Sequence, residues 1–268
     1  MSAAITAFFH KPSSTFSYVV ADPATHRAAV IDPVLDYDAA AARSGTTSAQ
    51  ALVDFLHARN LTLDWILETH AHADHVSAAQ YLKKVLGGKI AIGEGIRQVQ
   101  ATFVRLFNLE SQVPSDGSQF DHLFKDGETF RIGDLEARAM ATPGHTSDSL
   151  TYAVGDAAFV GDTLFMPDSG TARCDFPGGD AGRLYDSIRK ILSLPENTRL
   201  CMCHDYAPNG REYMHQTTVA DQKRANIHVH DGVPREEFIK LRTGRDKTLS
   251  VPALLLPAVQ INIRAGRL

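Results

Sequence analysis

The segment Ile66–Lys84 has the sequence ILETHAHADHVSAAQYLKK and brings His70, His72, Asp74 and His75 into one short turn. An apolar run that is typical of a buried strand precedes the turn, and a run with helical periodicity follows it. The turn is therefore expected at the end of a strand, where α/β folds place their functional sites. Imidazole and carboxylate groups are suitable ligands for zinc and for non-haem iron. The segment predicts a metal site on an α/β fold.

Three other segments repeat this arrangement of an apolar run followed by a metal-binding side chain. MATPGHTSDS carries His145, AAFVGDTLF carries Asp162 and LCMCHDY carries His204. A lone histidine is more often a structural or surface residue, but ligand-type side chains at four strand ends rarely arise by chance. We therefore expect these loops to meet at one metal centre. Seven histidines have no such setting and are expected to be packing or surface residues: His10, His26, His57, His122, His215, His228 and His230.

The first half of the chain predicts a hairpin followed by a βαβ unit. FSYVVAD and HRAAVIDPV are apolar runs separated by the turn signal PAT. A helix is expected to follow, capped by Thr47 or Ser48. LTLDWILET is then expected to form a buried strand, SAAQYLKKVLGG a helix that stops at Gly87, and KIAIGE the next strand. This order implies a βαβ unit.

The second half predicts a helix, a series of short strands and a partly helical tail. IRQVQATFVRLFNLE has helical periodicity, and short strands with turn signals at Asp126-Gly127 and Gly133-Asp134 follow it. DAGRLYDSIRKILSLP is expected to form a helix that ends before Pro195, and TRLCMCHDY a strand. The tail predicts one or two short helices, then the apolar run VPALLLPAVQINI as packing structure. Because no linker or repeat is visible, we expect one α/β domain over residues 1–268.

Composition excludes several classes of function. A formal net charge of −4 over 268 residues leaves no basic footprint for nucleic acid. No apolar run approaches the roughly 20 residues of a membrane helix, and the N-terminus lacks a secretory signal, so a cytoplasmic protein is expected. The three cysteines, Cys174, Cys201 and Cys203, are too few for a disulfide framework. Cys201 and Cys203 are expected to be small buried residues that do not bond to each other.

These motifs resemble those of the metallo-β-lactamase superfamily. THAHADH, PGHT, GDTLF and HDY match its H-x-H-x-D-H, His, Asp and His motifs in order, over about residues 5–210. The resemblance implies an αβ/βα four-layer sandwich of two mixed sheets, with helices outside and the metal at one edge. In the two-metal hydrolases of the superfamily, residues matching His70, His72, His145 and bridging Asp162 hold one ion. Residues matching Asp74, His75 and His204 help to hold the second.

Two segments resemble the persulfide dioxygenase family more narrowly. The segment 166–188 fits its G-x-x-R-x-D-F signature with Gly170, Arg173, Asp175 and Phe176, and the segment 204–227 is similar to its H-D-Y region. This resemblance implies one ferrous ion per chain and oxidation of glutathione persulfide by O₂ to sulfite and glutathione. It also implies site residues: the iron ligands His70, His145 and Asp162; the supporting residues His72, Asp74, His75 and His204; and Asp74, His75 and Tyr206 as candidate catalytic residues.

Two other readings of the metal cluster stay open. A glyoxalase II-like hydrolase would hold two zinc ions and use a bridging hydroxide to attack a thioester. Its longer helical substrate domain has no clear counterpart in the short tail beyond His204. A purely structural metal site fits less well, because structural zinc sites are usually closed and rich in sulfur. β-Lactam hydrolysis is not expected, because those enzymes act outside the cytoplasm.

Three residues near the predicted site have two possible roles each. Arg173 is expected either to bind a carboxylate of glutathione or to form an ion pair with Asp175. Tyr206 either offers its hydroxyl near the metal or packs. Cys174 either approaches the substrate or fills space in the core. The resemblance also suggests a homo-oligomer, although the sequence contains no interface signature.

Overall fold

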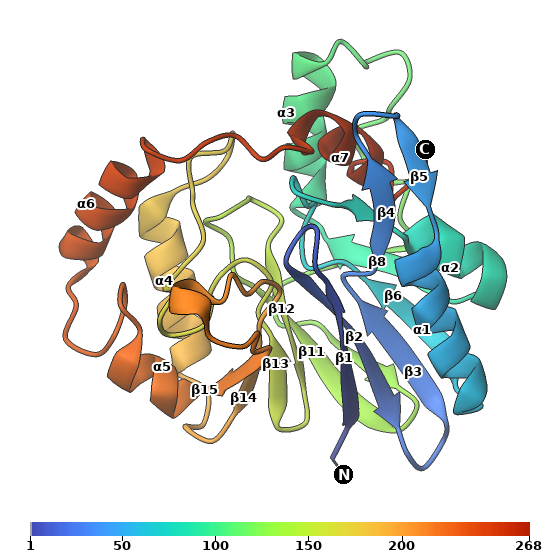
Figure 1. Cartoon of the computed structure of the whole chain (residues 1–268), viewed down its shortest axis with the longest axis horizontal. Helices are drawn as coiled ribbons and strands as arrows, with labels where there is room; N and C mark the ends of the chain where they lie inside the picture. Colours follow the sequence, from blue (N-terminus) through green and yellow to red (C-terminus); the bar gives the residue numbers. More distant parts are fainter. Residues whose placement is uncertain (1) are drawn as a thin grey trace.

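Two six-stranded sheets pack against each other in the computed structural model, which describes residues 2–268 (Figure 1). The first sheet contains, in spatial order, β1 (Ala4–His10), β2 (Thr15–Asp22), β3 (Arg27–Ile31), β6 (Thr62–Leu67), β8 (Lys89–Gly93) and β9 (His122–Phe124). The second contains β10 (Thr129–Ile132), β11 (Leu135–Ala141), β12 (Leu150–Val154), β13 (Ala157–Phe159), β14 (Arg199–Cys201) and β15 (Gln216–Thr218). A small third sheet joins β5 (Arg43–Gly45), β4 (Val34–Asp38) and β7 (Val76–Ser77).

Both large sheets are mixed. In the first, β1, β2 and β3 are antiparallel, whereas β3, β6, β8 and β9 run parallel. In the second, only the pair β13 and β14 is parallel. With helices on the outer faces, this arrangement confirms the α/β four-layer sandwich that the resemblance implies.

Helices cover the outside of each sheet. On the first sheet lie α1 (Thr47–Ala58), α2 (Ala79–Leu86) and α3 (Ile96–Leu106), and on the second lie α4 (Ala181–Leu192), α5 (Val219–Ala225) and α6 (Arg235–Asp246) (Figure 1). A short 3₁₀ turn covers Pro208–Gly210, and α7 (Leu255–Asn262) packs beside β7. None of the helices formed by residues 2–268 combines the length and hydropathy needed to cross a membrane.

The core follows from side-chain alternation along the buried strands. In β3, Val30 faces the outer helices while its neighbour Ile31 faces the second sheet. In β13 and the residue that follows it, Phe159 points between the sheets and Val160 points toward α4. Because both faces are covered, these strands are apolar throughout rather than alternating with polar residues.

Most of the predicted elements are confirmed. β2 and β3 form the antiparallel hairpin, and β6, α2 and β8 form the βαβ unit with parallel strands. Gly87, at φ 78°, ends α2 as expected. β1, whose sequence AITAFFH is mostly apolar, was not among the predicted strands; it pairs with β2 at the edge of the first sheet. The apolar run in the tail, residues 251–263, contains the whole of α7.

The predicted cap of α1 is wrong. The helix begins after Thr46, which makes no side-chain capping bond. Instead, the Asp36 carboxylate on β4 accepts the Ser48 N–H at 2.8 Å and the Ser48 hydroxyl at 2.7 Å. A tertiary contact therefore satisfies the helix end that the sequence assigned to a local side chain.

The topology gathers the four histidine and aspartate loops. The loop with His70 follows β6, the loop with His145 joins β11 to β12, Asp162 follows β13, and His204 follows β14. β13 and β14 are parallel, so their carboxyl ends lie at one edge of the second sheet. The loops that follow the carboxyl ends of β6, β11, β13 and β14 thus supply the residues of the candidate site.

Gly144, the residue before His145, packs closely against α4 and so allows the packing of this loop to be tested by mutation. It has φ 146°, and a Cβ there would lie 2.3 Å from Leu184 Cα in α4. We expect Gly144→Ala to lower the free energy of unfolding by about 2–5 kcal/mol, because backbone strain adds to overpacking. Gly127→Ala is the matched control, because Gly127 has φ 77° and no atom within 4 Å of its Cβ position. Urea unfolding measures the free energy of unfolding of both variants. Equal losses of this free energy in Gly144→Ala and Gly127→Ala would contradict the close packing of Gly144 against α4.

Candidate metal centre

His70, His145 and Asp162 form a buried three-residue group. One ligand-type atom from each lies within 4.8 Å of the others. The three side chains come from three separate loops, so only the fold brings them together. Two imidazoles and one carboxylate on one side of a cavity form the donor set of non-haem iron sites and also suit zinc.

The imidazole of His145 is fixed by a backbone carbonyl. Its Nδ1 lies 2.6 Å from the Arg173 carbonyl oxygen, so Nδ1 carries the proton and donates it. Its Nε2 then keeps a free lone pair and lies 3.7 Å from Asp162 Oδ2. This is the orientation that a histidine needs in order to bind a metal through Nε2.

The imidazole of His70 is fixed by a relay from Asp32. The Thr69 hydroxyl donates to Asp32 Oδ2 at 2.9 Å, so its oxygen is free to accept the Nδ1 proton of His70 at 3.0 Å. The Nε2 of His70 is buried and has no hydrogen-bond partner among residues 2–268. Neither has Asp162 Oδ1. Buried polar atoms without partners are costly, and a bound cation would satisfy both.

Asp32 is a site residue that sequence reasoning missed. It is 2% exposed, has φ 48°, and also accepts the Thr69 N–H at 2.7 Å and the His72 Nε2 proton at 3.0 Å. Burial alone would raise the pKa of its carboxyl group, but His72 and the Thr69 hydrogen bonds outweigh burial and lower that pKa. The available signal was an acidic residue before Pro33 at the end of a buried strand.

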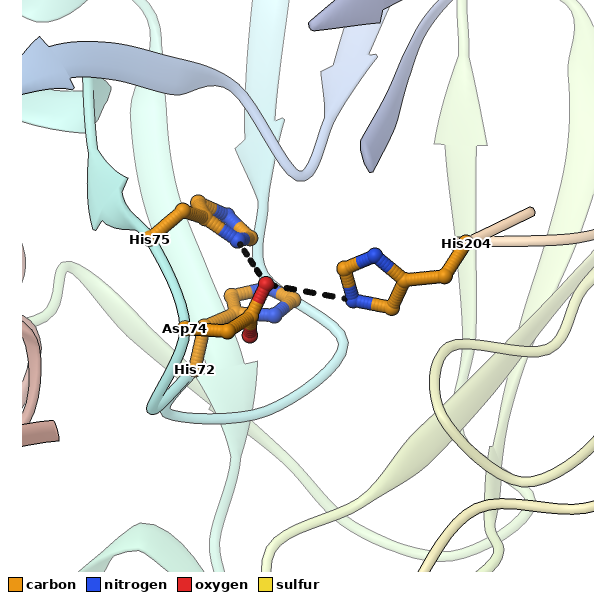
Figure 2. Close-up of side chains that lie close together, drawn as sticks. All are labelled: His72, Asp74, His75 and His204. Carbon is orange, nitrogen blue, oxygen red and sulfur yellow. Dashed lines mark hydrogen bonds and ion pairs between the residues drawn. The ribbon is translucent and has the colours of Figure 1, made fainter. Parts of the chain in front are cut away.

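His72, Asp74, His75 and His204 form a second group, again with one ligand-type atom from each within 4.8 Å of the others. Figure 2 shows Asp74 between the other side chains, with Oδ2 3.3 Å from His75 Nδ1 and 3.4 Å from His204 Nε2. The two-ion arrangement of the superfamily hydrolases would pair His72 with His70 and His145. In this structure His72 is grouped with Asp74, His75 and His204 instead.

Asp162 connects the two groups. Its Oδ1 lies 3.3 Å from His204 Nε2, and it also belongs to a group with Cys203 and His204. This is the position that a bridging carboxylate would need. None of the seven histidines left out of the predicted site joins a ligand group within residues 2–268.

His72 is held by two buried carboxylates, those of Asp32 and Glu68. Its Nε2 lies 3.0 Å from Asp32 Oδ1 and 3.6 Å from Glu68 Oε2. Burial would lower the pKa of His72, but the two carboxylates outweigh it and raise that pKa well above the ordinary value. Glu68, which also bonds the Ser77 hydroxyl, was not predicted as a site residue.

Asn262 on α7 ties down the backbone of the metal loop. Its side-chain nitrogen donates to the carbonyls of His72 and His75, each at 2.8 Å, and its oxygen accepts the Ser77 N–H at 2.9 Å. The residue is 4% exposed. The sequence assigned this stretch to packing alone, because no local pattern connects it to a loop that lies 187 residues earlier.

A cavity of about 640 Å³ opens onto two members of the three-residue group, His145 and Asp162. Asp74, His145 and Asp162 line one part of it, and Arg173 and Tyr206 line others. The size is in the range of small-molecule sites. The cavity thus offers room for a substrate beside the candidate ligands.

Arg173 is engaged in an ion pair, whereas Tyr206 is exposed and stacks on a histidine of the second group. The Arg173 guanidinium donates to both Asp175 oxygens, at 2.6 and 2.8 Å, and to the Ser250 carbonyl. The Tyr206 ring is 55% exposed and stacks on the His204 ring.

The three cysteines are free and buried, as expected. Burial and the nearby Asp246 carboxylate raise the pKa of the Cys174 thiol to about 12. Its Sγ donates to Asp246 at 3.3 Å. The thiol is therefore protonated, and a protonated buried thiol is a poor nucleophile and a poor metal ligand.

Comparisons with known proteins agree with this site. The family model described as Metallo-beta-lactamase superfamily matches residues 10–204 of this chain. A probable metallo-hydrolase of Burkholderia pseudomallei is 53% identical over 98% of this chain and 93% of its own length. Glyoxylase B2 of Dictyostelium discoideum is 49% identical over 99% of this chain and 92% of its own length. A beta-lactamase hydrolase-like protein of Agrobacterium fabrum is 52% identical over 98% of this chain, which spans 61% of that relative.

More distant relatives carry a different name. The mitochondrial persulfide dioxygenase ETHE1 of Homo sapiens is 30% identical over 96% of this chain and 87% of its own length. The crystal structure of ETHE1 from Myxococcus xanthus is similar with a TM-score of 0.78 and 31% identity, covering 98% of this chain and 99% of that one. The relatives thus agree on the fold, while their names divide between hydrolase and dioxygenase.

Removal of the Asn262 side chain should weaken metal binding without unfolding the protein. We expect Asn262→Ala to raise the metal dissociation constant by about 10–100-fold, because the loop with His70 and His75 loses its backbone clamp. Competition with a chelator measures this constant. Gln260→Ala is the matched control, because that amide donates only within its own helix, to Leu256. An unchanged dissociation constant in Asn262→Ala would show that α7 does not hold the site.

Proposed function

The chain belongs to the metallo-β-lactamase superfamily, and we propose that it is a mononuclear non-haem iron persulfide dioxygenase. The proposed reaction converts glutathione persulfide, O₂ and water into glutathione, sulfite and two protons. The outer sulfur loses four electrons, and O₂ takes up the same four. Each chain would hold one Fe²⁺ through His70, His145 and Asp162.

The observation that carries this proposal is the separate geometry of that three-residue group. The His145 and His70 rings are each fixed through Nδ1, so both Nε2 atoms and the Asp162 carboxylate converge. Two imidazoles and one carboxylate form the two-His, one-carboxylate triad of non-haem iron oxygenases. Such a triad leaves adjacent positions open for a sulfur ligand and O₂.

The bound iron would supply the oxidation chemistry, and the protein would supply orientation and proton handling. Asp74 lines the cavity and is held between His75 and His204. Its carboxylate would accept a hydrogen bond from a persulfide that enters beside the triad. His75 fixes Asp74, and Tyr206 stacks on His204 and forms part of the cavity wall.

The named relatives support this assignment in part. The human persulfide dioxygenase and the Myxococcus xanthus structure match nearly the whole chain at 30% and 31% identity. Glutathione is a component of the reducing cytosol. The proposed substrate therefore agrees with the cytoplasmic location expected from the sequence.

A second candidate is a dinuclear zinc hydrolase of a thioester such as S-lactoylglutathione. The group of His72, Asp74, His75 and His204 favours it, because these four residues offer enough donors for a second ion. The name of the 49% identical Dictyostelium discoideum relative points the same way. Asp162 would then bridge the two ions.

Metal content and oxygen uptake separate the two candidates. Protein purified without oxygen should hold one iron per chain and consume O₂ when glutathione persulfide is added. His204→Ala should retain that iron and lose about 10–100-fold in activity, because it removes a neighbour of Asp162 and Asp74 rather than a ligand. His70→Ala, His145→Ala and Asp162→Ala should each lose the metal. His57→Ala, which removes an exposed histidine from α1, is the matched control.

A dinuclear zinc hydrolase would give different metal counts and a different activity in the same experiments. Two zinc ions in the native protein, a fall to one ion in His204→Ala, and turnover of S-lactoylglutathione without O₂ uptake would reject the dioxygenase. Full metal content in any of the three ligand variants would remove that residue from the proposed triad.

A further inference from the structure

We propose that His10 carries protons out of the metal cavity, through the hydroxyl group of Ser13, into a second cavity. This inference rests on the proposed function only for the release of protons. The proposed dioxygenase releases two protons in each turnover, and hydrolysis of a thioester releases one. A path for protons serves either reaction, because a substrate that fills the metal cavity separates the metal centre from solvent on that side.

The second cavity has a volume of about 400 Å³ and adjoins the first. Asp74 and Ser13 line both cavities, whereas His10 and Asp36 line the second and not the first. Ser13 lies in the turn between β1 and β2, and this turn lies between the two halves of the fold (Figure 1). Ser13 therefore connects the space beside the candidate ligands with a space that a substrate in the first cavity does not fill.

Three side chains of the β1–β2 hairpin form a continuous hydrogen-bonded path. The Thr15 hydroxyl oxygen lies 2.7 Å from Ser13 Oγ, and Ser13 Oγ lies 2.7 Å from His10 Nδ1. His10 and Thr15 are paired across the two strands, so the turn places Ser13 beside both. Thr15 is 0% exposed, whereas the His10 side chain is 12% exposed. The path thus runs from the interior to a ring that reaches solvent.

The surroundings of Thr15 fix the direction in which the hydroxyl groups donate. His204 Nδ1 lies 3.2 Å from the Ser14 carbonyl oxygen, which can only accept, so this nitrogen carries a proton. The Thr15 hydroxyl oxygen, 3.3 Å from the same nitrogen, therefore cannot donate to it. Thr15 donates to Ser13 Oγ instead, and the Ser13 proton then points at His10 Nδ1. Each donor is thus aligned toward His10.

His10 is suited both to accept a proton and to release it. Burial lowers the pKa of His10 below its ordinary value, although Asp36 and Asp74 oppose this effect. At neutral pH the ring is therefore mostly neutral and keeps a lone pair on Nδ1. Its Nε2 lies 3.5 Å from Asp36 Oδ1 at the second cavity, so this carboxylate stabilises the ring while it holds the extra proton.

The proposed step moves protons and no electrons. A water molecule in the metal cavity donates a proton to Ser13 Oγ while Ser13 donates its own proton to His10 Nδ1. The hydroxide that is left takes up a proton released by the reaction. His10 then gives a proton to water or to a buffer base in the second cavity, which is the role of a histidine proton shuttle. Only O–H and N–H bonds form and break, and one proton has moved from the metal cavity to solvent.

Turnover at low buffer concentration tests this path. His10→Ala and Ser13→Ala should each lower kcat about tenfold and change KM less than about twofold, because proton release slows while substrate binding does not change. Addition of 1,2-dimethylimidazole, a bulky base that binds metals poorly, should restore kcat of His10→Ala and leave that of the wild type unchanged. His57→Ala, which removes an exposed histidine from α1, is the matched control.

An unchanged kcat of His10→Ala at low buffer concentration would overturn the proposal. A loss that the added base does not restore would also overturn it, because that result would indicate a structural role alone. The proton path and the proposed reaction fail separately. Thioester turnover without O₂ uptake, with the same effect of His10→Ala and of the added base, would reject the dioxygenase and keep the path.

Nitrogen NMR of the histidine rings in zinc-loaded protein provides a readout that needs no turnover. In the wild type, the neutral His10 ring should carry its proton on Nε2, with Nδ1 accepting from Ser13. Ser13→Ala should shift the Nδ1 resonance of His10, and His57→Ala should leave it unchanged. A wild-type His10 ring protonated on Nδ1 alone, or a resonance that does not respond to Ser13→Ala, would overturn the path.

Discussion

The buried carboxylate of Asp32 organises the metal loop, and the rest of the site depends on it. It accepts hydrogen bonds from the Thr69 backbone, the Thr69 hydroxyl and the His72 ring, which lie on the loop after β6. Through Thr69 it sets which nitrogen of His70 carries the proton. The left-handed backbone at Asp32, φ 48°, is a strained conformation of the kind that persists where the surroundings fix it. One carboxylate thus orients one candidate ligand and one neighbouring histidine.

The C-terminal helices are part of the site rather than a cover for it. On one side, Asn262 of α7 holds the backbone of the loop that carries His72 and His75. On the other, α6 holds the segment whose carbonyl orients His145: Arg242 donates to Thr171, and Asp246 accepts the Cys174 N–H at 3.0 Å. The geometry of the candidate ligands therefore depends on two helices that are distant in sequence from the metal loop.

The sequence predicts the site residues that belong to a local motif and misses those that act only through tertiary contacts. His70, His145, Asp162 and His204 each follow a strand and sit in a recognisable motif, so the loops that meet at the centre could be identified without a structure. The four-layer fold followed from the same motifs. Asp32, Glu68 and Asn262 have no such signature. Their roles arise from tertiary contacts, which are not visible in residue spacing. The predicted cap of α1 was wrong for the same reason, because the group that accepts the Ser48 N–H is Asp36 on the strand β4.

Anomalous X-ray scattering at the iron edge, from crystals of anaerobically purified protein, tests the single-ion assignment most directly. It locates each metal without reference to turnover. The predicted result is one iron peak per chain, bonded to His70 Nε2, His145 Nε2 and the Asp162 carboxylate, with His72, Asp74, His75 and His204 beyond bonding distance. A second peak among those four residues, or a single peak there instead, would contradict it.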